Sequence, residues 1–359
     1  MNYNDVRRKS SYIKVAGVGI GGGYPISVQS MTNTDTHDVE ATYRQISALA
    51  EAGCDIVRLT APDIEAAKTF AELKRRGVGI PLVADIHFNY KIAIACAKAG
   101  ADKIRINPGN IGSREKISEV VRACRDMALP IRIGVNSGSL DSDLLKKYGG
   151  PTAEALAESA IRQASVLEEL DFSDIAISIK SSDVYTMIRA NRILAKKVNY
   201  PLHLGVTEAG ARTSATVKSS IGIGTLLSEG IGDTVRVSLT DDPVREVALA
   251  HKILSSLGLS DRPMMDIISC PTCGRTRIPL VELLRQFEER AESEGLLSRG
   301  LKVAIMGCAV NGPGEAREAD IGIAGGDGEA LLFKHGEIIR KLPEGKIVDE
   351  LIREIKAME

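Results

Sequence analysis

The sequence predicts an α/β protein with an N-terminal (β/α)8 TIM barrel followed by a small α+β domain. From about Ile26 to Gly258, short β-rich runs alternate with amphipathic helical stretches. This alternation predicts a parallel sheet, and eight units of this size match the usual length of a closed barrel. An open, doubly wound sheet is the rival fold, which the regularity of the eight units disfavours. The last quarter of the chain carries two cysteine motifs instead.

Each expected strand is a short run rich in β-branched and aliphatic residues. The strands are expected at Ile26–Ser30, Ile56–Thr60, Leu82–Ile86, Lys103–Asn107, Ile131–Asn136, Ile175–Lys180, Leu202–Thr207 and Thr234–Leu239. The helices are expected at Val39–Ala52, Ile64–Arg76, Lys91–Ala99, Arg114–Met127, Ala153–Leu170 and Val184–Val198. Gly53, Gly77 and Gly100 directly follow the first three of these helices, where glycine commonly ends a helix.

The segments on either side of the barrel differ from it in pattern. Ser10–Tyr24 is rich in glycine, but the dinucleotide fingerprint needs a helix after its glycines and here a strand follows, so a hairpin that plugs the barrel is expected. Residues 1–258 are assigned to the barrel, with 1–25 as the hairpin, 259–263 to a linker and 264–359 to the second domain. The second domain is expected to contain a helix at Pro279–Glu294, strands at Lys302–Met306 and Asp320–Ala324, and a helix at Ile347–Lys356.

The composition argues against several classes of partner. The 359 residues carry a formal net charge of −1, only 4% aromatic residues and no tryptophan. Neither a broad positive field nor a stacking surface for nucleic acid is expected. No apolar run is long enough to span a bilayer, and no signal segment follows the N-terminus. Because six cysteines without an export signal indicate a reducing compartment, we expect a cytoplasmic protein that binds neither nucleic acid nor membranes.

Polar residues gather toward the ends of the expected strands. They are Arg58, Thr60, Asp85, His87, Arg105, Asn107, Arg132, Asn136, Ser178, Lys180, His203, Thr207, Glu208, Arg236 and Ser238. Residues two or four apart on a strand point to the same face, and the carboxyl ends of barrel strands are where such folds place their active sites. Since an unpaired charge inside a barrel is very costly, these groups must pair with one another or face a ligand.

The signs of the charges indicate a phosphorylated or diphosphorylated small molecule. The cations are Arg58, Arg105, Arg132, Lys180 and Arg236, whereas the clear acids are Asp85 and Glu208, with His87 and His203 as candidate proton carriers. Arginine forks match phosphate oxygens in a bidentate way. Residues 208–213 and a turn at 222–224 are expected to add backbone N–H donors. The alternative, a set of internal ion pairs, leaves most of the cations without a partner.

Three cysteines in the last quarter of the chain have the spacing of a metal or iron–sulfur site. Cys270 and Cys273 form a Cys-x-x-Cys pair, and Cys308 precedes Glu315 in a glycine-rich loop. Structural sites usually have four strong permanent ligands, so three thiolates with an exchangeable carboxylate favour a [4Fe–4S] cluster that admits a substrate. The alternative is a non-redox barrel enzyme with a structural Cys3His zinc domain completed by His335.

The other three cysteines are expected to have no role as ligands. Cys54, Cys96 and Cys124 have no Cys-x-x-Cys partner and fall in helical or pre-strand positions, where they are interpreted as buried thiols. A third hypothesis for the chain is a metal-sensing or cluster-carrying protein without enzymatic activity. The cationic barrel mouth argues against it.

The cysteine motifs resemble those of a known family. Cys-Pro-Thr-Cys-Gly-Arg at 270–275 and Gly-Cys-Ala-Val-Asn-Gly-Pro-Gly-Glu at 307–315 resemble the cluster motifs of bacterial 4-hydroxy-3-methylbut-2-enyl diphosphate synthases, the IspG/GcpE family. Val28–Thr34 and Arg105–Asn110 fit it too, and the resemblance covers essentially the whole chain in the two-domain form. It implies the reductive ring opening of 2-C-methyl-D-erythritol 2,4-cyclodiphosphate to 4-hydroxy-3-methylbut-2-enyl diphosphate in the non-mevalonate isoprenoid pathway.

The resemblance also implies a role for each matching residue. A [4Fe–4S] cluster would be held by Cys270, Cys273, Cys308 and Glu315, and Glu315 would give way to a substrate oxygen. The cyclic diphosphate would be gripped by Arg58, Arg105, Arg132 and Lys180 and placed by Asp85, His87, Asn107, Asn136, His203 and Arg236. Glu208 would be the acid–base group of the barrel, and Asn311 would reach the substrate from the cluster side.

The resemblance further implies partners for the chain. Electrons would come from a flavodoxin or ferredoxin. The active site would be shared between the two subunits of a homodimer, with the cluster domain of one chain capping the barrel of the other.

Overall fold

The computed structural model of the chain describes residues 6–260, 262–309 and 317–358. The chain divides into two units, Met1–Ser260 and Asp261–Glu359, each with its own sheet and hydrophobic core. Within the described ranges, no helix has both the length and the apolar character that crossing a bilayer requires.

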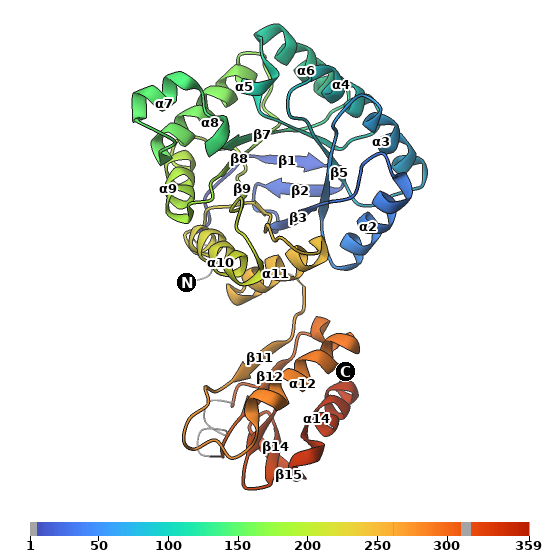
Figure 1. Ribbon diagram of the computed structural model, residues 1–359, viewed down its shortest axis with the longest axis vertical. Helices are drawn as coiled ribbons and strands as arrows, with labels where there is room; N and C mark the ends of the chain where they lie inside the picture. Colours follow the sequence, from blue (N-terminus) through green and yellow to red (C-terminus); the bar gives the residue numbers. More distant parts are fainter. Residues whose placement is uncertain (1–5, 261, 310–316, 359) are drawn as a thin grey trace. The chain divides into compact units, whose positions relative to one another are not determined.

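Eight parallel strands form the sheet of the first unit, inside a layer of helices (Figure 1). They are β3 (Ser27–Met31), β4 (Ile56–Thr60), β5 (Leu82–Asp85), β6 (Lys103–Ile106), β7 (Ile131–Asn136), β8 (Ile175–Lys180), β9 (His203–Leu204) and β10 (Thr234–Val235). The strands pair in the order β8-β7-β6-β5-β4-β3-β10-β9, and a parallel bridge between Ile177 and Leu202 joins β8 to β9. The predicted TIM barrel is therefore confirmed.

The last two barrel strands are shorter than the sequence predicts. In β9 the ladder ends at Leu204, and one further backbone bond runs from Arg236 N to the Leu204 oxygen, at 2.9 Å. At Gly205 the two strands lie so close that a Cβ atom would be 2.5 Å from the Arg236 carbonyl oxygen. This close approach requires a glycine, and glycine weakens strand pairing.

Helices connect the strands and cover the outside of the barrel (Figure 1). They are α2 (Val39–Glu51), α3 (Ala66–Arg75), α4 (Tyr90–Lys98), α5 (Pro108–Ile111), α6 (Arg114–Asp126), α7 (Ser142–Tyr148), α8 (Ala153–Glu168), α9 (Val184–Ala195), α10 (Arg212–Ser228) and α11 (Pro243–Ser256). The side chains of Asp38, Asn89, Thr152 and Asp183 accept backbone N–H bonds at the starts of α2, α4, α8 and α9. These caps explain why the four helices begin where they do.

A β-hairpin packs into the barrel at the end where the strands begin. Its strands, β1 (Tyr12–Val15) and β2 (Val18–Gly21), pair antiparallel and are visible in the middle of the ring in Figure 1. The hairpin residues Ile13, Val15 and Ile20 form one buried cluster with Ile56, Val83 and Ala176 of the barrel strands. These six side chains form an apolar floor that keeps water out of the barrel from this side.

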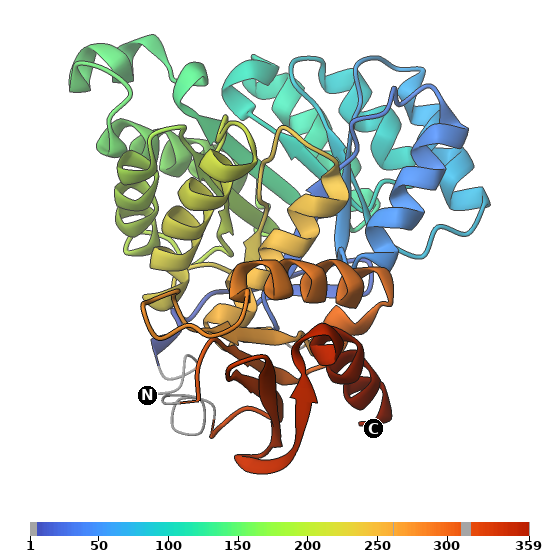
Figure 2. The ribbon, with the colours of Figure 1, turned by 60° about the horizontal axis from the view of Figure 1, so that its bottom comes forward.

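The described residues of the second unit form a five-stranded mixed sheet and two α-helices. Strands β11 (Asp266–Ser269), β12 (Lys302–Met306) and β13 (Ile321–Gly325) run parallel, and β14 (Glu329–Lys334) and β15 (Glu337–Pro343) continue the sheet antiparallel. Helices α12 (Leu280–Ser293) and α14 (Ile347–Ala357) pack against each other and share one hydrophobic core with the sheet (Figure 2). This core is separate from that of the barrel.

Candidate active site

Most of the polar residues predicted from the strand ends line the inside of the barrel. Asp85 stands opposite Arg105 in the strand register, and Arg105 stands opposite Arg132. The exposed fractions are 8% for Arg58, 2% for Asp85, 7% for Arg105, 1% for Arg132 and 7% for Lys180. Water therefore solvates few of these charges, and the neighbouring side chains decide whether each group is charged.

Asp85 is the carboxylate at the centre of this group. One of its oxygens lies 3.0 Å from Arg105 Nη1 and the other lies 3.6 Å from Arg58 Nε. Burial opposes the ionisation of Asp85, but the guanidinium groups of Arg58, Arg105 and Arg132 outweigh it and hold the pKa of the carboxyl below its usual value. Asp85 is thus ionised and neutralises part of the cationic cluster.

A second buried acid, Glu246 of α11, was missed by the sequence analysis. Its carboxylate lies 3.3 Å from Arg236 Nη2 and accepts a hydrogen bond from Ser30 Oγ at 2.9 Å. It also accepts the Leu239 N–H at 3.0 Å. Glu246 is 4% exposed on a helix face that is otherwise apolar except for His251. That contrast was the available signal, and it means that Arg236 belongs to an internal pair.

The barrel strands also carry buried polar side chains whose polar atoms have no hydrogen-bond partner among the described residues. In the described part of the chain, no hydrogen-bond partner is present for Lys103 Nζ, Arg132 Nε and Nη2, either ring nitrogen of His203, or the amide of Gln29. All four residues are 1% exposed or less. Lys103 and Gln29 were not predicted, although Lys103 precedes Arg105 by two residues and so shares its face. Buried polar atoms in such numbers point to a ligand or water that satisfies them.

Other predicted residues stand nearer the mouth of the barrel. Asn107 donates to Ser139 Oγ at 3.0 Å and accepts the Gly109 N–H at 3.1 Å, while His87 is exposed and Asn136 is half-buried. Glu208 is exposed in the loop after β9, with φ of 51°. A non-glycine residue rarely adopts this left-handed conformation, and such strain is common at functional sites.

The expected phosphate-binding turn at residues 222–224 is wrong. Gly222 and Gly224 lie inside helix α10, where backbone N–H groups are already bonded. Gly222 instead allows close packing, since a Cβ there would lie 2.8 Å from Val206 Cγ2. The start of α10 remains available for an anion, because its N-cap residue, Ala211, has no side chain that could accept the first N–H groups.

The cysteines of the second unit share one edge of its sheet. Cys270 directly follows β11, and Cys308 follows the neighbouring strand β12 after Gly307. The Gly307 N–H donates to Cys270 Sγ at 3.3 Å, and Arg277 N donates to the Gly307 oxygen at 2.9 Å, which holds the loop containing Cys273 against the same edge. All three thiols are free and at least partly exposed. Soft thiols with N–H···S bonds are a donor set that fits an iron–sulfur cluster.

His335, the fourth ligand of the zinc alternative, lies at the opposite end of this sheet. Lys334 stands opposite Ile321, the first residue of β13, and Ile321 stands opposite Val303 near the start of β12. The cysteines follow the other ends of β11 and β12. The intervening strand is roughly 15 Å long, so a site formed by Cys270, Cys273, Cys308 and His335 is not compatible with this fold.

The remaining predicted ligands lie outside the described residues. Glu315 and Asn311 belong to the undescribed 310–316 segment, and among the described residues no three His, Cys, Asp or Glu side chains are close enough to hold a metal ion. Cys54, Cys96 and Cys124 are buried, and burial raises the pKa of each thiol to about 12. They are therefore poor ligands and poor nucleophiles.

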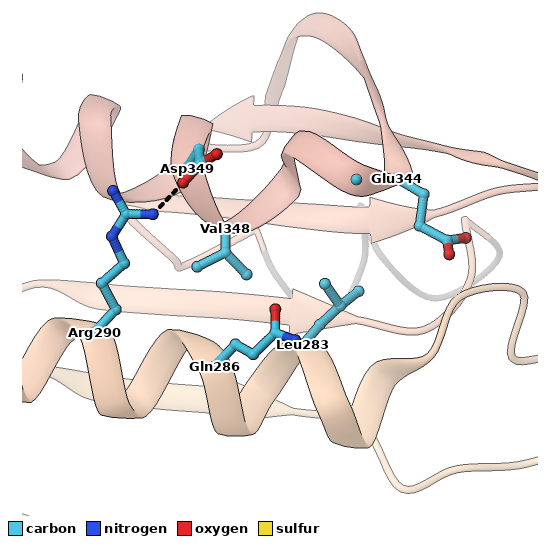
Figure 3. A pocket seen from close by; sticks show the side chains of 7 residues that line it. Leu283, Gln286, Arg290, Glu344, Val348 and Asp349 are labelled. Atoms are coloured by element: carbon cyan, nitrogen blue, oxygen red, sulfur yellow. Dashed lines mark hydrogen bonds and ion pairs between the residues drawn. The ribbon is translucent and has the colours of Figure 1, made fainter.

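Two surface pockets contain none of the predicted residues. The pocket in the second unit has a volume of about 210 Å³ and lies between α12 and the start of α14, where Arg290 and Asp349 form an ion pair (Figure 3). The pocket in the first unit has a volume of about 320 Å³ and is lined by Arg8, Arg192, Ala195, Lys196, Glu229 and Ile231. Internal pairs such as Arg192–Glu229, at 2.5 Å, already neutralise charges in their walls.

Comparison with known proteins agrees with this geometry. Residues 10–251 match the GcpE TIM-barrel domain and residues 266–357 match the GcpE protein C-terminal domain. A 4-hydroxy-3-methylbut-2-en-1-yl diphosphate synthase (flavodoxin) of Clostridium perfringens is 56% identical over 352 residues, which cover 98% of this chain and 99% of that protein. The protein of the same name from Geobacter sulfurreducens is 53% identical over 351 residues, 98% of each chain.

Among solved structures, the spore coat polysaccharide biosynthesis protein SpsE of Bacillus subtilis has a similar fold. It shares a TM-score of 0.50 at 11% identity and covers 69% of this chain and 73% of its own. The two family models together span nearly the whole chain, and the two curated relatives each cover 98% of it at more than half identity. The chain belongs to the GcpE family, the 4-hydroxy-3-methylbut-2-en-1-yl diphosphate synthases.

Proposed function

We propose that this chain opens the ring of 2-C-methyl-D-erythritol 2,4-cyclodiphosphate by a two-electron reduction, with the diphosphate held in the cationic barrel. The observation that carries the proposal is the excess of buried cations. Arg132 and Lys180 have no acid partner among the described residues, whereas Asp85 is shared by Arg58 and Arg105. A dianionic ligand supplies the missing negative charge.

The arginines of β4, β6 and β7, together with Lys180, are the groups that grip the diphosphate. Guanidinium forks bind phosphate oxygens in pairs, and the N–H groups on Arg132 Nε and Nη2 have no acceptor among the described residues. In the buried barrel these contacts are stronger than at an exposed surface. Asp85 orients Arg58 and Arg105 for this role through its two ion pairs.

Glu208 is the acid–base group of the proposal. The linear product contains one oxygen fewer than the substrate, and that oxygen leaves as water, so a proton donor must stand near it. Glu208 follows β9 at the mouth and is held in a left-handed conformation. His87, Asn107, Asn136, His203 and Arg236 place the remaining polar groups of the substrate.

The cysteine edge of the second unit holds the redox centre in this proposal. Cys270, Cys273, Cys308 and Glu315 would hold a [4Fe–4S] cluster, which when bound would pass the two electrons of the external donor one at a time and would offer an exchangeable coordination position. Asn311 is the residue proposed to contact the substrate from the cluster side. The shared edge and the Gly307 N–H···Sγ bond to Cys270 support three of these ligands.

Two partners complete the proposal. The electron donor is a flavodoxin or ferredoxin; the relatives from Clostridium and Geobacter are named as flavodoxin enzymes. The active form is a homodimer in which the cluster domain of one chain serves the barrel of the other.

Metal content after anaerobic purification tests the cluster. We expect a brown protein with about four iron and four sulfide per chain. Cys308→Ser should lose most of this iron, whereas the matched variant Cys124→Ser, which alters a buried thiol of the barrel, should retain it. A colourless zinc protein with full activity would refute the cluster.

Turnover tests the reaction. With the cyclic diphosphate and a strong reductant under anaerobic conditions, the wild type should form the linear allylic diphosphate. Arg105→Met should raise the Kd of the cyclic diphosphate about tenfold or more, since a charge-assisted hydrogen bond is worth roughly 1.5–3 kcal/mol. Undiminished binding by this variant would contradict the assignment of the barrel site.

A further inference from the structure

Lys103 is the least exposed lysine or arginine among the described residues of the barrel. It is the first residue of β6 and stands opposite Val83, while Arg105, two residues later on the same face, stands opposite Asp85. The Lys103 side chain is 0% exposed, and its Nζ has no hydrogen-bond partner among the described residues. An ammonium group normally makes three hydrogen bonds, so this surrounding suits an uncharged amine far better.

Among the described residues, an apolar cluster lies between Lys103 and the hairpin side of the barrel. The neighbour of Lys103, Val83, belongs to the apolar floor, together with Ile56 of β4 and Ala176 of β8, and the hairpin residues Ile13 and Ile20 seal that floor. Solvation of a charge on Lys103 must therefore come from the side of the barrel mouth. That side is where the diphosphate is proposed to bind.

The charged groups around Lys103 also disfavour its ammonium form. In the described part of the chain, the buried titratable groups around the interior are Arg58, Asp85, Arg105, Arg132, Lys180 and His203 on strands β4 to β9, Arg236 directly after β10, and Glu246 of α11. Burial first, and then the charges of Arg132 and Arg58, lower the pKa of Lys103 well below its usual value. The two acids are already engaged with arginines.

We propose that Lys103 is uncharged in the free enzyme and takes up a proton when the diphosphate binds above it. The inference rests on the proposed barrel site. Two negative charges among Arg58, Arg105 and Arg132 cancel the repulsion that keeps Lys103 neutral and attract its ammonium form. Lys103 thereby acts as a proton-coupled positioning residue for the substrate: it adds a cation only when an anion is present, which reduces charge repulsion in the empty barrel.

Proton uptake has a definite effect on affinity. The Lys103 pKa rises on binding, so the charged form stabilises the complex at pH values below the pKa of the complex, and affinity falls as pH rises through it. By linkage, if binding takes up one proton, the affinity falls by a factor of about ten for each unit by which the pH is raised. The substrate contributes no proton of its own, because each phosphorus of a cyclic diphosphate lacks the second ionisation of a phosphate monoester.

Calorimetric titration measures this uptake directly. The cluster-loaded enzyme, oxidised and without reductant so that no turnover occurs, is titrated with the cyclic diphosphate near pH 8 in two buffers of different ionisation enthalpy. We expect the wild type to take up more protons than Lys103→Met, by up to one per chain. The ratio of wild-type to variant affinity should fall as pH rises, by as much as tenfold per unit. Any proton uptake by the other buried lysine, Lys180, is the same in the wild type and in Lys103→Met, so it does not affect the difference between them.

Controls separate this inference from the proposed function. Lys68→Met removes an exposed lysine paired with Glu65 and should match the wild type. Lys103→Gln keeps a hydrogen-bonding side chain of similar length and replaces the methionine variant if that variant fails to fold. Binding by the wild type without proton uptake, or equal uptake by wild type and Lys103 variants, overturns the inference and leaves the barrel site intact. Absence of any binding to the wild type overturns the barrel site itself.

Discussion

Asp85 is the residue on which the charge balance of the barrel depends. It is 2% exposed and accepts ion pairs from two arginines that have few other partners: Arg58 otherwise contacts the Met31 sulfur, a weak acceptor, with Nε at 3.1 Å and Nη2 at 2.8 Å. Removal of this one carboxylate leaves two buried guanidinium groups uncompensated. The cost of a broken buried pair is mostly that of the charge left behind.

We therefore expect Asp85→Asn to destabilise the barrel by roughly 3–5 kcal/mol. The measurement is the urea concentration at the midpoint of barrel unfolding. Glu282→Gln is the control, since it removes an exposed partner of Arg285 on α12 and should leave the midpoint nearly unchanged. An Asp85→Asn midpoint equal to that of the wild type would mean that water reaches Arg58 and Arg105.

Gly134 is required at its position because an arginine lies against it. A Cβ atom there would be 2.5 Å from Arg105 Nε, and Arg105 is held on its other side by Asp85. Gly134→Ala should displace the guanidinium group and weaken binding of the cyclic diphosphate about tenfold, because overpacking costs roughly 1–3 kcal/mol. Gly138→Ala is the matched control, with nothing within 4 Å of its added methyl group. Equal dissociation constants for both variants would contradict this role of Gly134.

At the scale of elements, His37 connects two loops at the carboxyl end of the barrel through two hydrogen bonds. Its Nδ1 lies 3.0 Å from Asp35 in the loop after β3, and its Nε2 lies 3.1 Å from Asp63 in the loop after β4. Both carboxylates accept a hydrogen bond only when the ring is protonated, since neutral imidazole has one donor. The hydrogen bonds to Asp63 and Asp35 raise the pKa of His37 above its usual value.

The stabilisation from the two hydrogen bonds of His37 should decrease as pH rises. Because the folded pKa of His37 is raised, its stabilisation is complete below the unfolded value of about 6.5 and is lost as pH rises through the folded value. Protection factors for amide hydrogen exchange at residues 33–38 and 62–66 should therefore fall with rising pH across this window. In His37→Gln they should be independent of pH, while the bond from Thr36 to the Thr60 oxygen, at 2.7 Å, persists in both proteins. A wild-type profile as flat as that of the variant would sink the prediction.

Secondary-structure elements were predictable to the extent that their signals are local. The helices whose N-caps are Asp38, Asn89, Thr152 and Asp183 begin within a residue of the expected position, because the cap and the apolar periodicity lie in the same short stretch. The lengths of β9 and β10 were not predictable. They depend on the contact between Gly205 and Arg236, which the sequence separates by a whole helix.

At the scale of the whole molecule, the proposed reaction needs residues from both units. Glu208 belongs to the first unit and Cys308 to the second. In the proposed dimer each barrel uses the cluster of the other chain, so a mixed dimer of Glu208→Gln and Cys308→Ser has one intact site. Random mixing should then restore about a quarter of wild-type activity, since half the dimers are mixed and each has one of two sites intact.

The mixing experiment requires proof that subunits exchange, which mass spectrometry of tagged chains supplies. Each variant alone should remain inactive. If the mixed dimers form and no activity returns, the barrel and the cluster of the same chain work together instead.

The sequence by itself determined the barrel, the presence of a second domain, the family and the side chains at the strand ends, because alternation, strand parity and the cysteine motifs are all local patterns. The tertiary structure decided which charged side chains pair with one another. It assigned Asp85 to Arg58 and Arg105, added Glu246 to Arg236, and placed His335 at the far end of the sheet from the cysteines.

Lys103 illustrates the physical reason for this division. Its identity and its place on the strand are visible in the sequence, but its lack of a partner among the described residues is a property of eight strands and a hairpin packed together. Local periodicity sets which way a side chain points, whereas long-range packing sets what it meets and hence which charge it carries.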